Sequence, residues 1–522
     1  MEDLTHGLIQ AFFTFETPIA RGRGHLKLRD GKCWCLLTSM LELKGHEELA
    51  GPRRELGVVH GAFRGGEGRK TWLDMRNDEL SRLGKTASTQ PYCLVVGGGQ
   101  AGIALGARLR RLRVPTIIIE KNKRPGDSWR NRYRSLCLHN SVWYDHMPYI
   151  PFPDHWPVFS PKDKLGDWLE AYTLIMELVY WGSTECKSAR FDPVEEKWEV
   201  SVNKEGEEIL LYPKHLVLAT GMSSFPNVPL FPGAENIQGV QCHSSQHMGG
   251  QGWDGKQCVV VGSNNSAHDI CADLWESGAA RVTMLQRSST HVLRTQTMPI
   301  AEASPYHEGS KYTIEDADLL FASVPYKIMH RFALERYKRT ADIDAKFYDD
   351  LKRVGFMLDF GDDGSGLFMK YLRRGSGYYI DVGASDLVIK GEINLKSGVT
   401  LNEMRGRSVV LSDKTEVEAD LVVYATGYGS MNEWVAKLIS REVADKVGKC
   451  WGLGSDTKKD PGPWERELRN MWKPTQQPAL WFHGGNLHQS RHYSLVLALQ
   501  IKARMEGIPI QVYGMDKVHH TS

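Results

Sequence analysis

Residues 91–120, PYCLVVGGGQAGIALGARLRRLRVPTIIIE, constrain the fold of this chain more than any other stretch. The apolar run at 92–96 has the length and β-branching of a buried parallel strand. It leads into Gly97-x-Gly99-x-x-Gly102, which has the spacing of a dinucleotide-binding turn. In this pattern the first glycine permits the turn out of the strand. The second lets a pyrophosphate approach the backbone, and the third lets a helix pack closely on the sheet.

The residues after the glycines complete a βαβ unit. A segment with helical propensity runs from about 101 to 113, and a second apolar run, 116–119, ends in Glu120. The helix N-terminus would present free N–H groups and its positive dipole end to phosphates. An acidic side chain at Glu120 accepts hydrogen bonds from a ribose diol and disfavours a 2′-phosphate. The unit therefore predicts a site for FAD or NAD rather than NADP, and a plain glycine turn does not explain Glu120.

A second fingerprint follows the strand expected at 258–261. It reads Gly262-x-Asn264-x-x-Ala267, in which Ala is an accepted variant of the third glycine. Asn264 replaces the middle glycine, and Asn tolerates left-handed backbone better than other residues with a side chain. The next strand ends at Arg287, and an arginine there suits a 2′-phosphate, so this site favours NADPH. The alternative is a structural βαβ unit with an incidental surface arginine.

Composition excludes several other classes of protein. The 522 residues carry 65 Lys and Arg against 63 Asp and Glu, a net charge of +2, which indicates no nucleic-acid or membrane-surface partner. No apolar run approaches the ~20 residues of a membrane span, and the first residues lack a leader pattern. The nine cysteines show no CxxC spacing, which indicates a reducing compartment and no metal site. We therefore expect a cytoplasmic protein.

The predicted fold class is α/β, with two Rossmann-like dinucleotide-binding domains, the second inserted in the first, and a small α+β segment at the N-terminus. The expected domains are an N-terminal segment (1–88), the first part of the FAD domain (89–224), the NADPH domain (225–419) and the C-terminal part of the FAD domain (420–522). An Ala-Thr-Gly turn closes a strand in each nucleotide domain, at Ala219 and again at Ala425.

Outside the fingerprints, patterns predict shorter elements. In the N-terminal segment we expect two strands within 25–43 joined by a turn at Asp30-Gly31, and a helix over 71–83. Further helices are expected at 162–172, 326–337, 342–354 and from about Ser490, and further strands at 198–202, 209–212, 215–218, 282–285, 408–411, 416–418, 420–424 and 479–483.

An FAD site beside an NADPH site predicts hydride transfer from nicotinamide to flavin. A disulfide reductase would need a pair of redox cysteines near the flavin, and none is spaced for that role. Two possibilities remain for the reduced flavin: reaction with oxygen, or reduction of a small acceptor.

Over residues 92–503 the chain resembles the flavin-containing monooxygenases, and within them fungal and bacterial relatives of the plant YUCCA-type enzymes. The motifs that carry this resemblance are GGGQAG at 97–102, GDSWR at 126–130, LHNS at 138–141, PFPDHWP at 151–157, ATG at 219–221, GVQCHSS at 239–245, the Gly262 fingerprint, ATGY at 425–428 and Gly485-Asn486. In the family's identifying motif Gly239 and His243 match, whereas Ile237 and His247 stand where aromatic residues are expected. The motif supports the family but no subclass, and His243 is assigned an organising role between the nucleotide domains. The N-terminal segment resembles the last strands of an NTF2-like domain.

The resemblance implies a mechanism. NADPH reduces FAD, O2 adds to give a flavin C4a-hydroperoxide, NADP⁺ shields it from water, and a small organic substrate takes one oxygen atom. Asn140 is the candidate catalytic residue, because a matching Asn lies beside the reactive flavin edge in animal members.

We expect Trp129 to pack against the flavin and Arg130 to pair with its phosphates, the alternative being surface positions on a loop. The full set of predicted cofactor-binding residues is Gly97, Gly99, Gln100, Ala101, Gly102, Glu120, Trp129, Arg130, His139, Gly262, Asn264, Ser266, Ala267, Arg287, Ser288 and Asn486.

Two other functions fit the same nucleotide sites: an NAD(P)H oxidase or quinone reductase that releases peroxide, and a non-enzymatic nucleotide-binding protein. The sequence leaves the substrate open between heteroatom oxygenation, ketone oxygenation and oxidative decarboxylation. It also leaves the oligomeric state open, with a homodimer as one candidate.

Overall fold

The computed structural model describes residues 8–57, 68–223, 225–298, 304–452 and 468–512. The first residues of the chain, on which the expectation of no leader rests, lie outside these ranges.

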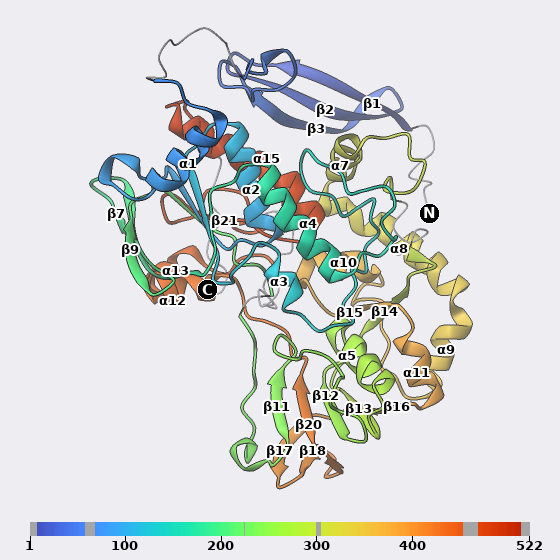
Figure 1. Ribbon diagram of the computed structural model, residues 1–522. Helices are drawn as coiled ribbons and strands as arrows, with labels where there is room; N and C mark the ends of the chain where they lie inside the picture. The colour runs from blue at the N-terminus through green and yellow to red at the C-terminus, as the bar shows by residue number, and fades with distance from the viewer. Residues whose placement is uncertain (1–7, 58–67, 224, 299–303, 453–467, 513–522) are drawn as a thin grey trace.

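The first nucleotide domain is built on a five-stranded parallel sheet (Figure 1). Its strands, in spatial order, are β21 (Leu480–Phe482), β10 (His215–Leu218), β4 (Cys93–Val96), β5 (Thr116–Ile119) and β6 (Tyr180–Trp181). Alternate residues of each strand enter different cores: Leu94 packs on one face of the sheet and Val95 on the other. Because both faces are covered, the strands are apolar except at Thr116 and His215, the first residues of β5 and β10.

Helices and a small antiparallel sheet cover these two faces. On one side lie α2 (Gln100–Arg111), α15 (Leu487–Met505) and α4 (Lys162–Ile175), with the short α3 (Asp127–Arg130) beside α4. On the other side lie the antiparallel strands β7 (Thr184–Asp192), β8 (Lys197–Lys204) and β9 (Glu207–Leu211), together with α12 (Asn432–Leu438) and α13 (Arg441–Val447). The first sheet is therefore completed by a strand and a helix from the far C-terminal part of the chain.

The second nucleotide domain repeats this plan in the lower part of Figure 1. Its parallel sheet has the order β11 (Val240–His243), β20 (Leu421–Tyr424), β12 (Gln257–Val261), β13 (Arg281–Gln286) and β16 (Ile393–Ser397). The helices α5 (Asn265–Glu276) and α11 (Ala384–Lys390) cover one face, and β17 (Leu401–Arg405), β18 (Ser408–Leu411) and β19 (Glu416–Glu418) cover the other. Strand pairing places β20 in this sheet, so the expected boundary at 419/420 is wrong and the second domain extends through Tyr424. The other boundaries remain predictions.

A helical layer lies between the two domains and the N-terminal sheet. It consists of α7 (Ile314–Ala322), α8 (Tyr326–Ile343), α9 (Ala345–Arg353) and α10 (Gly366–Arg374), with the two-stranded parallel pair β14 (His291–Arg294) and β15 (Tyr378–Asp381). Short 3-10 turns occur at Gly51–Arg53, Ala87–Thr89 and Ala234–Asn236.

The N-terminal segment forms a three-stranded antiparallel sheet of β1 (Leu8–Glu16), β2 (Ala20–Arg29) and β3 (Lys32–Leu43), followed by α1 (Trp72–Arg82). The predicted turn at Asp30-Gly31 joins β2 and β3, and both residues have positive φ. The sheet lies over α7 and α15 at the top of Figure 1. Arg23 forms an ion pair with Asp316 of α7 at 2.5 Å. The likeness to an NTF2-like domain remains a prediction.

Most predicted elements are present within a few residues, but some elements were missed and one helix begins earlier than expected. The stretch 377–389, for which no helix was predicted, contains strand β15 and helix α11. Strand β7 was not predicted, because its alternate residues are exposed and polar. Helix α15 begins at Leu487 rather than near Ser490, since Asn486 caps it.

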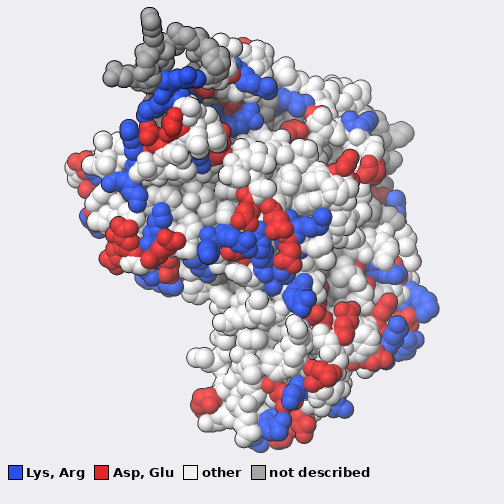
Figure 2. All heavy atoms as spheres, in the orientation of Figure 1, with Lys and Arg blue, Asp and Glu red and all other residues white. Residues whose placement is uncertain are grey.

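The surface in Figure 2 carries interspersed cations and anions, including a mixed cluster over α3 and α4. Among the described residues, none of the helices combines the length and apolar character that a bilayer crossing needs.

Candidate active site

The two fingerprint turns share one backbone arrangement. Gly97 follows β4 with φ +111°, and a Cβ there would lie 2.3 Å from the carbonyl oxygen of Ala219. Gly262 follows β12 with φ +135°, and its Cβ would lie 2.5 Å from the carbonyl oxygen of Ala425. A side chain fits at neither position, since the turn needs positive φ and the neighbouring strand's Ala-Thr-Gly turn occupies the space. The repeated Ala-Thr-Gly turns are thus the partners of the two fingerprints.

The remaining glycines of the first fingerprint have different roles. A Cβ on Gly102 would lie 1.9 Å from the carbonyl oxygen of Gly97, so this glycine is required for the close approach of α2 to the sheet. A Cβ on Gly99 would meet only the Ser128 hydroxyl, at an ordinary 3.5 Å. Gly99 caps α2 without a side-chain hydrogen bond, so the first N–H groups of the helix remain available. The space beside Gly99 fits a phosphate group of FAD.

The Glu120 carboxylate is held beside this turn. Its Oε2 accepts a hydrogen bond from the Gly98 N–H at 2.8 Å, and its Oε1 accepts from the backbone and side-chain N–H groups of Asn122 at 2.9 and 2.8 Å. The side chain is buried but lines the cavity described below. Its remaining lone pairs suit a ribose diol.

The middle position of the second fingerprint corrects one prediction. Asn264 caps α5 with φ −97° and ψ −168°, close to the extended backbone of Gly99 at φ −76° and ψ −170°. Left-handed backbone is therefore not what this position requires, and an asparagine fits without strain. Its amide oxygen accepts a hydrogen bond from the Thr290 hydroxyl at 3.4 Å. Ala267 is buried in α5, where a small residue permits close packing.

Both fingerprints open on one cavity of 1290 Å³. The predicted residues that line it are Gly97, Gly99, Gln100, Ala101, Glu120, Trp129, His139, Asn140, Ser266 and Asn486. The predicted residues that do not line it are Gly102, Arg130, Gly262, Asn264, Ala267, Arg287, Ser288, Gly239 and His243. Gly102, Gly262 and Ala267 shape the turns from behind, whereas Arg287 and Ser288 lie exposed after β13, where Arg287 makes no ion pair with the described residues.

Arg130 does not have the predicted role toward phosphates. Its guanidinium donates to Asp127 at 3.0 Å, to Asp167 at 2.8 Å and to Glu170 at 2.7 Å, and also to the carbonyl oxygen of Pro125. Three carboxylates therefore engage it, and it joins α3 to α4 away from the cavity. No local pattern marks Asp167 and Glu170 as partners, because they lie 37 and 40 residues beyond Arg130.

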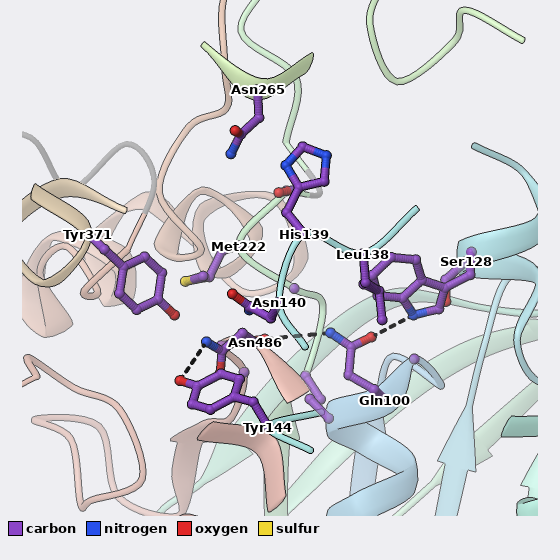
Figure 3. A pocket seen from close by; sticks show the side chains of 18 of the residues that line it. Gln100, Ser128, Leu138, His139, Asn140, Tyr144, Met222, Asn265, Tyr371 and Asn486 are labelled. Carbon is purple, nitrogen blue, oxygen red and sulfur yellow. Dashed lines mark hydrogen bonds between the residues drawn. The ribbon is translucent and has the colours of Figure 1, made fainter. Parts of the chain in front are cut away.

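Trp129 lines the cavity, and its packing against the flavin stays a prediction. Its indole N–H donates to the amide oxygen of Gln100 at 3.1 Å, and the Gln100 amide N–H donates to the carbonyl oxygen of Gly485 at 3.5 Å. This chain of hydrogen bonds, seen at the right of Figure 3, joins the α3 motif to the fingerprint helix and to the C-terminal glycine turn.

Asn140, Asn486 and Tyr144 lie together near the centre of Figure 3. Asn486 caps α15 through its amide oxygen, which accepts from the Gln489 N–H at 2.9 Å, and its amide N–H donates to the Tyr144 hydroxyl at 3.2 Å. The Asn140 amide makes no hydrogen bond with any described residue. It is half-buried and remains free to bind a cofactor or substrate.

A contact between the domains passes through Asp269 of α5. Its carboxylate accepts a hydrogen bond from the Tyr133 hydroxyl at 2.7 Å and lies 3.4 Å from His139 Nε2. Burial alone would lower the pKa of His139, but hydrogen bonding to Asp269 and Asn265 outweighs it and raises the pKa. Asp269 and Tyr133 were not predicted as site residues, since no local motif marks them.

His243 is a structural residue of the second domain. Its Nε2 donates to the Gly427 carbonyl oxygen at 3.0 Å, and its Nδ1 accepts from the Ser245 N–H at 3.1 Å. Burial lowers its pKa, which favours this neutral form. A Cβ on Gly239 would lie 2.5 Å from the Ala419 carbonyl oxygen, so this glycine permits the close approach of the linker to the strand turn. The organising role predicted for the motif fits these contacts.

Sequence reasoning also missed a buried network behind the site. Arg491 of α15 forms a two-pronged ion pair with Asp318 of α7, at 2.8 and 2.6 Å. The same guanidinium donates to the carbonyl oxygens of Tyr144 and His146, both at 2.9 Å, so it holds the loop that carries Tyr144. The Tyr306 hydroxyl donates to Asp318 at 2.7 Å. A charged pair in the interior gives no periodic signal in a sequence.

Two dinucleotide fingerprints on one cavity, in two domains with the same βαβ plan, define a flavoprotein oxidoreductase with separate flavin and nicotinamide sites. Comparison with known proteins shows which flavoproteins the chain is similar to. A family model described as flavin-binding monooxygenase-like matches residues 121–301. The indole-3-pyruvate monooxygenase YUCCA1 of Oryza sativa subsp. japonica is 28% identical over 362 residues, which cover 68% of this chain and 82% of that protein.

Solved structures share the fold. A flavin-containing monooxygenase from Stenotrophomonas maltophilia has a TM-score of 0.52 and 16% identity over 80% of this chain and 99% of that one. A cyclohexanone monooxygenase bound to ε-caprolactone has a TM-score of 0.57 and 18% identity over 80% of this chain and 88% of that one. In sequence and in fold the chain is similar to flavin-containing monooxygenases. The predictions of a two-domain α/β fold, of a flavin-dependent monooxygenase and of FAD and NADPH as its cofactors are confirmed.

Proposed function

We propose that the protein transfers one oxygen atom of O2 to a small organic substrate bound beside Asn140. The overall reaction consumes one NADPH, one proton and one O2, and releases NADP⁺, water and the oxygenated substrate. The observation that carries the proposal is the single cavity onto which Gly99 of one fingerprint and Ser266 of the other both open. FAD supplies, when bound, the redox chemistry that couples NADPH to O2.

The chain's own residues hold the cofactors and exclude water. Gly97 and Gly102 give the turn its shape. When FAD is bound, the N-terminus of α2 would hold its phosphates and Glu120 would accept hydrogen bonds from its ribose. The N-terminus of α5, with Ser266, would hold the nicotinamide nucleotide. We assign the 2′-phosphate to Arg287 and Ser288. Both side chains are exposed, and Arg287 makes no ion pair with the described residues.

The substrate end of the cavity is mostly apolar and aromatic. The aromatic residues Phe321, Phe332, Tyr337, Phe368 and Tyr371 line the cavity, and Phe321 lies edge-on to Phe368 with 5.4 Å between ring centroids. Within this wall the Asn140 amide can donate to an oxygen atom or accept from the nicotinamide amide. Because the relative from rice is named for indole-3-pyruvate, that 2-oxo acid is the first substrate to test, beside an amine, a sulfide and a cyclic ketone.

The test is turnover of the FAD-loaded protein with NADPH under ¹⁸O2. We expect one ¹⁸O atom in the product, with product and consumed NADPH in equal amounts. Consumption of NADPH with stoichiometric peroxide and unlabelled substrate across the whole panel would instead support the oxidase or quinone reductase, which the comparisons do not favour.

The proposal also covers the cellular compartment and the oligomeric state. All nine cysteines are free thiols, which suits a reducing compartment such as the cytoplasm. A homodimer remains the candidate assembly, and its test is the mass in solution.

A further inference from the structure

The N-terminal sheet contributes a buried lysine to the active-site cavity. Lys27 of β2 is only 5% exposed, and it lines the cavity together with Leu8, Gln10 and Trp34. Its ammonium group makes no hydrogen bond and no ion pair with any of the described residues. Burial lowers the pKa of Lys27, because a charged amine loses its water there.

The groups around Lys27 do not neutralise it. Its cross-strand neighbours are Gln10 and Cys35, and the Cys35 thiol donates to the carbonyl oxygen of Ser323 at 3.1 Å. His25, two residues along the same face, is buried with its pKa lowered to about 4, so it carries no charge near neutral pH.

Two of the three carboxylates of α7, the helix that faces this sheet, are engaged elsewhere, and the third, Glu315, is exposed. Asp316 binds Arg23 at 2.5 Å, and Asp318 binds Arg491 at 2.6 Å. Both carboxylates therefore already face an arginine, and neither makes an ion pair with Lys27. Burying a cation without a partner costs free energy, and an anion bound in the cavity would offset this cost.

The cavity wall beside Lys27 is apolar. Trp34 lies edge-on to Phe332, with 6.4 Å between ring centroids, and Leu320, Val324 and Met329 line the same region. The same cavity continues to Tyr371 and Asn140, which are drawn in Figure 3. A ligand that fits both ends has an apolar or aromatic body and one anionic group.

We propose that Lys27 binds the carboxylate of an amphipathic organic acid whose apolar body lies along the aromatic wall toward Asn140. This inference rests on the proposed function, since the acid would be the substrate that receives oxygen. It gives the N-terminal sheet a role in substrate selection and explains why a lysine occupies a position where burial is otherwise unfavourable.

The experiment measures binding without turnover, in FAD-loaded protein saturated with NADP⁺. The probes are 3-phenylpropionate and 3-phenylpropanamide, which share shape but differ in charge, and calorimetry gives their dissociation constants. Wild-type protein should bind the acid about 10- to 100-fold more tightly than the amide, the range of a charged hydrogen bond. Lys27→Met should reduce this ratio to near one, and Lys27→Arg should preserve it. Lys32→Met, at the exposed start of β3 in the same sheet, is the matched control and should leave the ratio unchanged.

Stability gives a second readout that does not need a ligand. Removing an uncompensated buried cation should raise the melting temperature of the Lys27→Met protein above that of wild type. The proposal is overturned if wild-type protein binds acid and amide equally or does not bind the acid at millimolar concentration, or if Lys27→Met keeps the preference. Because no turnover is involved, absence of ¹⁸O transfer with retained acid binding would count against the proposed function and not against this site.

Discussion

The carbonyl oxygen of Ala219 lies 2.3 Å from the position that a Cβ atom on Gly97 would occupy. The two residues directly follow neighbouring parallel strands, β10 and β4. The same relationship joins Ala425 and Gly262 in the second domain, at 2.5 Å. Each dinucleotide turn is therefore shaped by an Ala-Thr-Gly turn far away in sequence. Gly221 and Gly427, the last residues of these turns, both have positive φ near +80°.

Substitution of two fingerprint glycines should separate folding from flavin binding. Gly102→Ala places a methyl group 1.9 Å from a backbone oxygen, so we expect a loss of about 1–3 kcal/mol in the free energy of unfolding as well as a lower flavin content. Gly99→Ala meets only the Ser128 hydroxyl at 3.5 Å, so the fold should persist while FAD binding is lost. Thermal unfolding and flavin absorbance per protein test both. A Gly99→Ala protein with a full complement of FAD would show that the pyrophosphate passes elsewhere.

Arg287→Ala should weaken the use of NADPH far more than that of NADH. Loss of a charged contact with the 2′-phosphate corresponds to about 1.5–3 kcal/mol, or about a 10- to 100-fold rise in the KM for NADPH. Steady-state kinetics with both nucleotides measure the effect. Arg281→Ala, at the exposed start of the same strand, is the control and should change neither constant. An equal rise in the KM for NADPH and NADH would contradict the assignment of the 2′-phosphate to Arg287.

Asn140→Ala should uncouple NADPH consumption from oxygenation. The amide makes no hydrogen bond with the described residues, so its removal should leave the melting temperature unchanged. We expect the yield of product per NADPH to fall about tenfold, with peroxide released in its place. Asn236→Ala, in an exposed turn where the amide contacts only Glu235, is the control. An unchanged yield of product per NADPH would show that Asn140 does not take part in oxygenation.

Arg130→Met should weaken the fold without altering phosphate binding. The side chain is 12% exposed and engages Asp127, Asp167 and Glu170, so we expect a loss of about 1–3 kcal/mol in stability. The dependence of FAD affinity on ionic strength should match that of wild type, because the guanidinium does not face the cavity. Arg124→Met, which approaches two of the same carboxylates from an exposed position, should have a smaller effect. A reduced salt dependence in Arg130→Met would restore the phosphate role.

The buried pair of Asp318 and Arg491 predicts an acid-dependent stability. Burial alone would raise the pKa of Asp318, but the Arg491 guanidinium outweighs it and holds the pKa well below its usual range. A folded-state pKa below the unfolded value of about 3.9 stabilises the protein above that pH, and the contribution is lost as the pH falls further. Asp318→Asn should cost about 3–5 kcal/mol at neutral pH, since it leaves a buried guanidinium uncompensated.

Melting temperatures of wild type and Asp318→Asn across pH measure this effect, and their difference should shrink in acid. Asp316→Asn, which alters the more exposed pair with Arg23, should lose much less. A difference that stays constant through the acid range would show that Asp318 contributes by packing rather than by charge.

Local signals in the sequence predicted the strands and helices whose pattern repeats over a short window. The β-branched runs before Gly97 and Gly262 become β4 and β12, and the repeated Ala-Thr-Gly turns mark equivalent places in both domains. The predictions failed where the deciding contact is distant. The strand Leu421–Tyr424 follows the expected boundary in sequence but pairs with β11 and β12, because hydrogen bonding to a sheet edge depends on tertiary position.

The amino-acid sequence by itself determined the two dinucleotide turns and the chemistry of Glu120, because glycine spacing and an acidic strand end act within about 25 residues. Only the tertiary structure decided which side chains share the cavity. Arg130 lies outside the cavity, because carboxylates of α3 and α4 surround its guanidinium. Asp269 of the second domain and Lys27 of the N-terminal sheet both line the cavity, although no local motif marks either residue. Such pairings depend on how separate elements pack, and charge compensation between residues hundreds of positions apart leaves no pattern in a single sequence.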